Sequence, residues 1–141
     1  MILLDTNVLS ELMKPAPEPA VIQWLDEQLD SQVFLTSITK AELELGIALL
    51  PKGKRKDTFA QLAGILFEEF QDRILPFDTS AASYYAHLVA NARKTGHTVS
   101  VEDAQIAAIT QANHLTLATR NSKDFEFIPG LLLINPWQTT G

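Results

Sequence analysis

The sequence predicts an α/β fold in which a central parallel sheet of four or five strands lies between two layers of helices. Two observations support this prediction. Short apolar segments typical of buried strands alternate along the chain with longer segments that repeat apolar residues at helical spacing. The first strand segment, Ile2–Leu4, is a continuous apolar run, as expected of a strand buried on both faces of a sheet. Such alternation indicates parallel strands joined by helical crossovers.

In the first half of the chain, the expected strands are separated by helices whose apolar residues recur every three or four positions. Pro15, Pro17 and Pro19 interrupt the first helical stretch, because proline has no amide N–H to donate inside a helix. Pro76 shortens the third strand for the same reason. We expect strands at 2–4, 33–36 and 74–77, and helices at 9–13, 19–30, 39–50 and 57–71.

The second half of the chain begins with a long helix, Thr79–Thr95, which we expect to end at Gly96 because glycine readily adopts the helix-terminating conformation. A linker leads to a helix at Ser100–Asn113, whose small alanine side chains suit close packing against a sheet. The last strands are expected at 115–119 and 131–134, with a polar turn between them at 120–125.

Length and composition limit the class of protein. The chain has 141 residues, 46% apolar and 20% charged, which fits one globular domain spanning residues 1–141. It has no cysteine for a disulfide or a thiolate metal site, and no apolar run approaches the ~20 residues that cross a bilayer. Because Met1 leads directly into the first strand, we expect no signal peptide and a cytoplasmic protein without membrane contact.

The charge of the chain argues against binding nucleic acid through bulk electrostatics, since the net charge is −6 and the pI about 4.9. The position of the acids matters more than their number. Acidic side chains that gather in one pocket and bind divalent cations attract phosphate through the metal. The basic segment Pro51–Lys56 holds four of the eleven Lys and Arg residues, and we expect it to be a solvated loop.

Four acidic residues lie where a predicted strand ends or a predicted helix begins: Asp5, Glu42, Asp103 and Asp124. Asp5 ends the first strand, and Asp124 follows the fourth. Glu42 and Asp103 lie in the first turns of predicted helices. In a parallel sheet such junctions lie on one edge, where open α/β sheets bind their ligands. We therefore expect these carboxylates, which are remote in the sequence, to converge in one pocket.

Each of these acids also has a purely structural explanation. The segments Thr39–Glu42 and Ser100–Asp103 both match a capping box, in which the carboxylate bonds to the backbone of the cap residue. Asp5 and Asp124 each suit a helix cap or a turn. The joint pattern favours a cation site, because gathered carboxylates repel each other unless cations compensate. Oxygen ligands suit Mg²⁺ or Mn²⁺, whereas no cysteine or close pair of histidines indicates zinc.

Four segments that contain these acids occur in a fixed order along the chain: Leu4–Glu11, Thr36–Leu43, Glu102–Ala108 and Thr119–Phe125. Together they resemble the four motifs of the PIN-domain ribonucleases, and they are most similar to the VapC and FitB branch of type II toxins. The resemblance covers nearly the whole chain, from Met1 to Trp137. It implies a PIN-like three-layer α/β/α fold.

The resemblance also implies metal-dependent cleavage of RNA phosphodiester bonds, with Asp5, Glu42 and Asp103 as catalytic acids. We assign the fourth acidic role to Asp124, although some family members place that acid where this chain has Asn121. We expect Asp5 and Asp103 to hold the main Mg²⁺ or Mn²⁺ ion. Glu42 and Asp124 are expected to complete the shell or to hold a second ion, in part through water.

Neighbouring polar residues are expected to support this site. Asn7 and Thr119, with Asn121, are assigned to orient the acids or the metal-bound waters. Arg120 and Lys123 flank the expected pocket and are candidates for contacts with RNA phosphates.

The resemblance implies partners as well. We expect a cognate antitoxin protein that clamps the helices at 9–13 and 19–30 and blocks the acidic pocket, with DNA contacted only through that antitoxin. A homodimer and an RNA substrate drawn from tRNA, rRNA or mRNA are also implied.

Two other functions stay open at this point. Asp5–Val8 after a strand resembles the start of an aspartate-nucleophile phosphatase site, although that family has a second aspartate where this chain has Asn7. The remaining alternative is a non-enzymatic subunit of an antitoxin–DNA regulatory complex.

Overall fold

The computed structural model describes residues 1–138 and confirms the three-layer α/β/α fold. Parallel strands form one sheet in the order β3-β2-β1-β4-β5. Their bounds are Ile2–Leu4 (β1), Val33–Thr36 (β2), Ile74–Leu75 (β3), Thr116–Ala118 (β4) and Leu132–Ile134 (β5). The chain winds from β1 through β2 to β3, then crosses to the other side of β1 to form β4 and β5. The carboxyl end of β1 is therefore the topological switch point, where open α/β sheets bind ligands.

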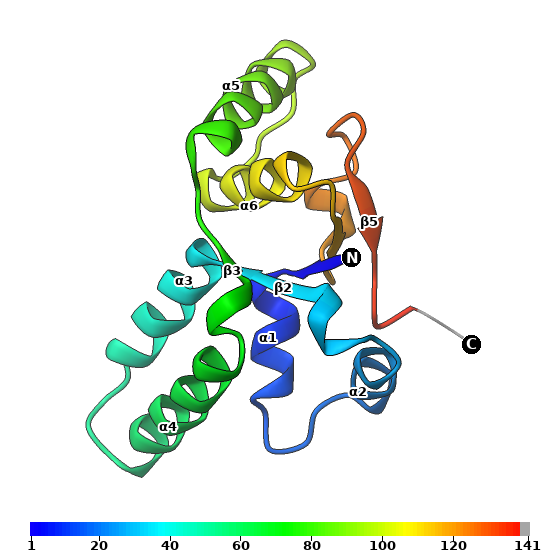
Figure 1. Ribbon diagram of the computed structural model, residues 1–141. Helices are drawn as coiled ribbons and strands as arrows, with labels where there is room; N and C mark the ends of the chain where they lie inside the picture. The colour runs from blue at the N-terminus through cyan, green and yellow to red at the C-terminus, as the bar shows by residue number, and fades with distance from the viewer. Residues whose placement is uncertain (139–141) are drawn as a thin grey trace.

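Helices cover both faces of this sheet (Figure 1). They are Thr6–Leu12 (α1), Pro19–Asp26 (α2), Ser37–Ala48 (α3), Lys54–Glu69 (α4), Thr79–Lys94 (α5) and Val101–Ala112 (α6). The helices α5 and α6 pack on one face, while α1, α2 and α4 pack on the other. In Figure 1, α3 and α4 extend together away from the sheet. None of the helices formed by residues 1–138 has the length and apolar character needed to span a bilayer.

Two apolar cores form because successive side chains of a strand point to opposite faces of the sheet. Leu3 and Leu117 lie in the core under α5 and α6. Leu4 and Ala118, the next residues along the same strands, lie in the core under α1, α2 and α4. All four are fully buried, which explains why the first strand has an unbroken apolar sequence.

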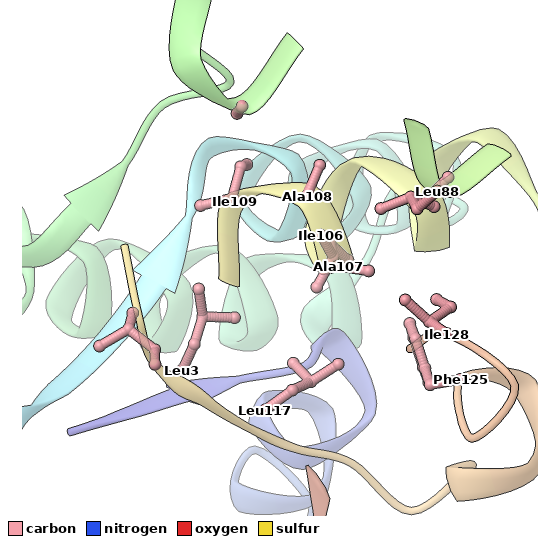
Figure 2. Close-up of a cluster of buried hydrophobic side chains, with 12 residues drawn as sticks. Leu3, Leu88, Ile106, Ala107, Ala108, Ile109, Leu117, Phe125 and Ile128 are labelled. Atoms are coloured by element: carbon pink, nitrogen blue, oxygen red, sulfur yellow. The ribbon is translucent and has the colours of Figure 1, made fainter. Parts of the chain in front are cut away.

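The helix α6 is embedded in the first of these cores, since six of its twelve residues are buried. Its alanines allow the helix to approach the sheet closely. Figure 2 shows Leu3 and Leu117 from the sheet beneath Ala107 of α6, with Phe125 and Ile128 at the side of the cluster. This packing fixes the first turn of α6, which carries one of the predicted acids.

The start of α3 corrects one sequence-based prediction. The helix begins at Ser37 rather than residue 39, because the hydroxyl of Thr36 accepts a hydrogen bond of 3.0 Å from the backbone N–H of Thr39. Thr36 is therefore the N-cap residue. The predicted capping box between Thr39 and Glu42 is wrong, and Glu42 lies beyond the first turn.

Other helix boundaries differ for similar local reasons. The helix α1 begins at Thr6 rather than residue 9, because the carboxylate of Asp5 accepts a hydrogen bond of 2.8 Å from the Thr6 N–H. The predicted basic loop is partly helical, since Lys54 begins α4. The helix α2 ends at Asp26 and is followed by a 3-10 turn at Asp30–Gln32. Each strand boundary lies within two residues of its predicted position.

Candidate active site

The carboxyl edge of the sheet opens into a pocket of about 440 Å³ that three of the four predicted acids line. Asp5 follows β1, Glu42 lies on α3, and Asp103 lies in the first turn of α6. The fourth, Asp124, lies outside this acidic pocket. With Lys123 it lines a second pocket of about 460 Å³. The structure therefore brings together acids from three remote parts of the chain and leaves the fourth next to them.

Asp5 is only 4% exposed, and both of its carboxylate oxygens accept hydrogen bonds. Oδ1 accepts from the backbone N–H of Thr6 at 2.8 Å. Oδ2 accepts from the hydroxyl of Thr119 at 2.7 Å and from the amide of Asn7 at 3.0 Å. Asn7 and Thr119, which we predicted to orient an acid, thus contact Asp5 directly.

These contacts tie α1 to the segment that follows β4. The side-chain N–H of Asn7 also donates to the hydroxyl of Thr119, at 3.3 Å. The side-chain oxygen of Asn7 accepts a hydrogen bond of 3.2 Å from the backbone N–H of Arg120. The Thr119 hydroxyl accepts a further bond of 3.1 Å from the N–H of Asn121. Asp5 is therefore held by a network that crosses between two neighbouring strands.

Glu42 is held by a chain of hydroxyl groups that sequence reasoning missed. Thr6 donates its hydroxyl proton to Oε1 of Glu42 at 2.7 Å. Because Thr6 gives its only hydroxyl proton to Glu42, its oxygen accepts a hydrogen bond of 3.0 Å from the Thr39 hydroxyl. The Thr39 oxygen in turn accepts a hydrogen bond of 3.3 Å from the Thr36 hydroxyl. These threonines lie in segments that resemble the family motifs, but threonine is so common at helix caps that their type alone did not reveal this role.

Two acids of the pocket, Asp5 and Asp103, have raised pKa values. Burial raises the pKa of Asp103 to about 6, and the charge of Asp5 is the next cause of the rise. Asp124 and Glu42 act in the same direction, so Asp124 influences the pocket from outside. Burial also raises the pKa of Asp5, against the hydrogen bonds that stabilise its charge. At neutral pH this arrangement concentrates negative charge, which a divalent cation would offset.

The donor set fits a cation such as Mg²⁺ or Mn²⁺, because carboxylate oxygens are the ligands these ions prefer. Among residues 1–138, no three acidic or histidine side chains are gathered closely enough to form a complete ligand cluster. The case for a metal site therefore rests on the type, charge and shared pocket of Asp5, Glu42 and Asp103.

Positive charge lies at the rim of the acidic pocket. Arg120 lines both pockets, and its guanidinium lies 5.0 Å from the centre of the Trp137 ring. Asn121 also lines both, whereas Lys123 lines only the second. Lys14 lines the acidic pocket as well, which we did not predict from the sequence.

Comparison with known proteins identifies the family to which this chain belongs. The family model for the PIN domain matches residues 2–130. VapC ribonuclease Y4jK of Sinorhizobium fredii is 43% identical to the chain, over 98% of the chain and 99% of the relative. Toxin FitB of Neisseria gonorrhoeae is 42% identical, over 97% of the chain and 99% of the relative.

A solved structure of FitAB bound to an IR36 DNA fragment has a TM-score of 0.92 and 39% identity, covering 100% of this chain and 99% of that chain. The family match, the sequence identity over nearly the whole chain and the structural similarity lead to one conclusion. The chain belongs to the PIN-domain family and is a close relative of the VapC and FitB toxins.

Proposed function

We propose that this chain is a Mg²⁺- or Mn²⁺-dependent endoribonuclease that acts as the toxin of a type II toxin–antitoxin pair. One observation carries the proposal: Asp5, Glu42 and Asp103, remote in the sequence, line one pocket at the switch point of the sheet. The similarity to a VapC ribonuclease and to toxin FitB over nearly the full chain supports this reaction class.

The proposed chemistry follows from the carboxylates. A divalent ion, when bound, would activate a water molecule to attack the phosphorus of a phosphodiester. It would also place positive charge next to the negatively charged non-bridging oxygens. We propose that Asp5 and Asp103 hold the ion directly, with Glu42 and Asp124 completing the shell, in part through water. Charge repulsion in the pocket supports a cation there, since the charges of Asp5, Asp124 and Glu42 all raise the pKa of Asp103 and a nearby cation would offset them.

Three polar residues complete the proposed site. Asn7 and Thr119 donate hydrogen bonds to the Asp5 carboxylate and so fix its orientation. We propose that Asn121, which lines the acidic pocket, orients a metal-bound water. These roles do not require a cysteine or histidine nucleophile.

The RNA backbone is proposed to run from the acidic pocket toward the second one, because the two pockets share Arg120 and Asn121. We propose that Arg120 and Lys123, which line the second pocket, contact its phosphates along this path. With a net charge of −6, the chain has little long-range attraction for RNA, so these local cations matter more.

We propose that a cognate antitoxin neutralises the chain, and that DNA is contacted only through that antitoxin. The related FitAB assembly is bound to a DNA fragment, whereas the acidic charge of this chain disfavours direct DNA binding. The homodimer that the family implies is tested by light scattering of the purified chain.

The test compares the wild type with Asp5→Asn and with Asp57→Asn. Asp57 is a matched control, an exposed acid in the first turn of α4 that lines none of the pockets described above. After brief induction in cells, new RNA 5′ ends are mapped. The wild type and Asp57→Asn should produce the same ends, and Asp5→Asn none. Purified wild-type protein should lose cleavage in EDTA and regain it with Mg²⁺ or Mn²⁺.

The outcomes also separate the alternatives. Undiminished Mg²⁺-dependent RNA cleavage by Asp5→Asn would contradict the assignment. Hydrolysis of small phosphomonoesters through an aspartyl-phosphate would favour the phosphatase, although Asn7 donates its amide to Asp5 and is not a second acid. Metal binding without cleavage of any RNA would favour the non-enzymatic subunit.

A further inference from the structure

Glu11 is a buried carboxylate at the acidic pocket that the proposed metal chemistry does not use. It lies on α1, is 5% exposed, and lines the pocket together with Lys14 and Arg120. A carboxylate with so little exposure requires partners for its oxygens. Oε1 accepts from the ammonium of Lys14 at 2.8 Å, and Oε2 accepts from the backbone N–H of Glu18 at 2.9 Å.

These two bonds fix the Lys14 ammonium relative to two helices. Glu18 is the N-cap residue of α2, so Glu11 joins the end of α1 to the start of α2 across the proline-rich turn. The Lys14 side chain is nevertheless 55% exposed. Because an ammonium has three N–H donors, Lys14 retains donors for an anion in the pocket while Glu11 holds it in place.

The backbone of Arg120 is fixed at the same rim by different contacts. Its backbone N–H donates to Asn7, and its carbonyl accepts from Asn135. The pKa of Glu11 is lowered by the Lys14 ammonium, by the Glu18 N–H and, more weakly, by the charge of Arg120. Glu11 is therefore ionised at neutral pH. The Lys14 ammonium is thus held by Glu11, and the Arg120 guanidinium lies over the Trp137 ring. Two cations at the rim of the acidic pocket suit a phosphodiester strand whose scissile group lies among the acids.

We propose that Glu11 is a positioning residue that holds the Lys14 ammonium at the rim of the acidic pocket, where Lys14 contacts an RNA phosphate next to the one that is cut. The inference rests on the proposed ribonuclease function and adds a substrate contact to it. A contact with a non-reacting phosphate is equally strong in the ground state and the transition state. Its loss raises KM and leaves kcat nearly unchanged.

Binding is tested in the Asp5→Asn protein with a short fluorescein-labelled single-stranded RNA of mixed sequence, over a range of salt concentrations. Adding Lys14→Gln should weaken binding about fivefold and reduce the slope of log affinity against log salt by about 0.7. Lys14→Arg should retain both values. The control is Lys40→Gln, because Lys40 also pairs with an acid, Glu44 on α3, but lies outside the acidic pocket.

Glu11→Gln separates positioning from bulk charge. The substitution keeps the size of the side chain and makes the protein more positive, so long-range attraction alone would tighten RNA binding. Positioning predicts binding that is weaker by about threefold, and no further loss when Glu11→Gln is added to Lys14→Gln. Tighter binding, or additive losses in the double variant, would overturn the role of Glu11.

The experiment distinguishes failure of this inference from failure of the proposed function. If the wild type cleaves RNA but Lys14→Gln leaves the affinity and the salt slope unchanged, the inference alone is wrong. If Lys14→Gln weakens binding but the wild type cleaves no RNA, the ribonuclease proposal is wrong, and of the inference only the contact between Lys14 and an RNA phosphate is retained. Absence of RNA binding by the Asp5→Asn protein, together with absence of cleavage by the wild type, would overturn both. Lys14 is exposed, so its variants should fold even if Glu11→Gln does not.

Discussion

The helices α3 and α6 are both twelve residues long, and each carries one acid of the pocket, yet they are held in different ways. Six residues of α6 are buried, from Ala104 to Thr110. In α3 only Thr39 is buried, while Leu45 is 60% exposed. The pocket thus has one wall that is part of the core and another that lies at the surface.

This difference explains how each acid is placed. The packing of α6 on the sheet sets the position of Asp103. Ser100 caps that helix, because its hydroxyl accepts a hydrogen bond of 3.1 Å from the backbone N–H of Asp103. Glu42 depends on its own hydrogen bond with Thr6, which links α3 to α1. Apolar packing fixes a whole helix, whereas a hydroxyl fixes a single side chain. The two acids should therefore respond differently to the loss of packing and to the loss of a hydroxyl.

The largest expected effect comes from removing packing under α6. Ile106→Ala should lower the free energy of unfolding by about 3 kcal/mol, because it removes methyl groups from a fully buried site and leaves a cavity. Leu45→Ala on α3 should change it by less than about 0.5 kcal/mol. Urea denaturation measures both values, and equal losses would contradict the distinction between the two helices.

The same contrast shows what the sequence could and could not predict. The alanine-rich pattern of 100–113 correctly predicted a helix packed on the sheet, and Ser100 marked its start. On α3 the start was misplaced, because Thr36 and Thr39 are both suitable caps and only the fold selects Thr36. The position of Asp124 depends on the path of a turn without periodicity, so no spacing rule could place it outside the pocket.

The next largest loss of stability is expected from removing the Thr6 hydroxyl, which holds Glu42. Thr6→Val keeps the shape of the side chain but removes the proton donor to Glu42 and leaves the buried Thr39 hydroxyl without one of its partners. We expect a loss of about 2 kcal/mol in stability and a fall in kcat of at least about tenfold. Ser100→Ala, the comparable change on α6, should cost about 1 kcal/mol and change kcat by less than about threefold. Similar effects on kcat would show that both acids depend on local bonds.

A smaller change in stability, in the stabilising direction, is expected when Asp103 is replaced by asparagine. Its pKa rises from an ordinary 3.8 to about 6, so the folded protein binds the proton more tightly than the unfolded chain does. The stability that protonated Asp103 contributes is complete below about pH 4 and is lost as the pH rises through 6.

Asp103→Asn should therefore stabilise the protein above pH 7 and have little effect near pH 4. A rise of this size corresponds to about 3 kcal/mol for a fully buried group, but Asp103 is partly exposed, so we expect about 1 kcal/mol. Thermal unfolding of both proteins across this pH range measures the difference. A gain that is the same at both ends of the range would rule out ionisation as its cause. Added Mg²⁺ should reduce the gain by stabilising the wild type alone.

The smallest effect is expected at the surface of α3. Leu49, the residue that follows α3, is 75% exposed, so Leu49→Gln removes little buried apolar area. Its side chain lies past the last helical turn, which limits any change in helix stability. The free energy of unfolding should change by less than about 0.5 kcal/mol in urea denaturation. A loss above about 1 kcal/mol that grows with protein concentration would mean that this surface is buried in solution by a second copy of the chain, because only association makes stability depend on concentration. The outer wall of the pocket would then also be held by packing, supplied by another molecule rather than by the sheet.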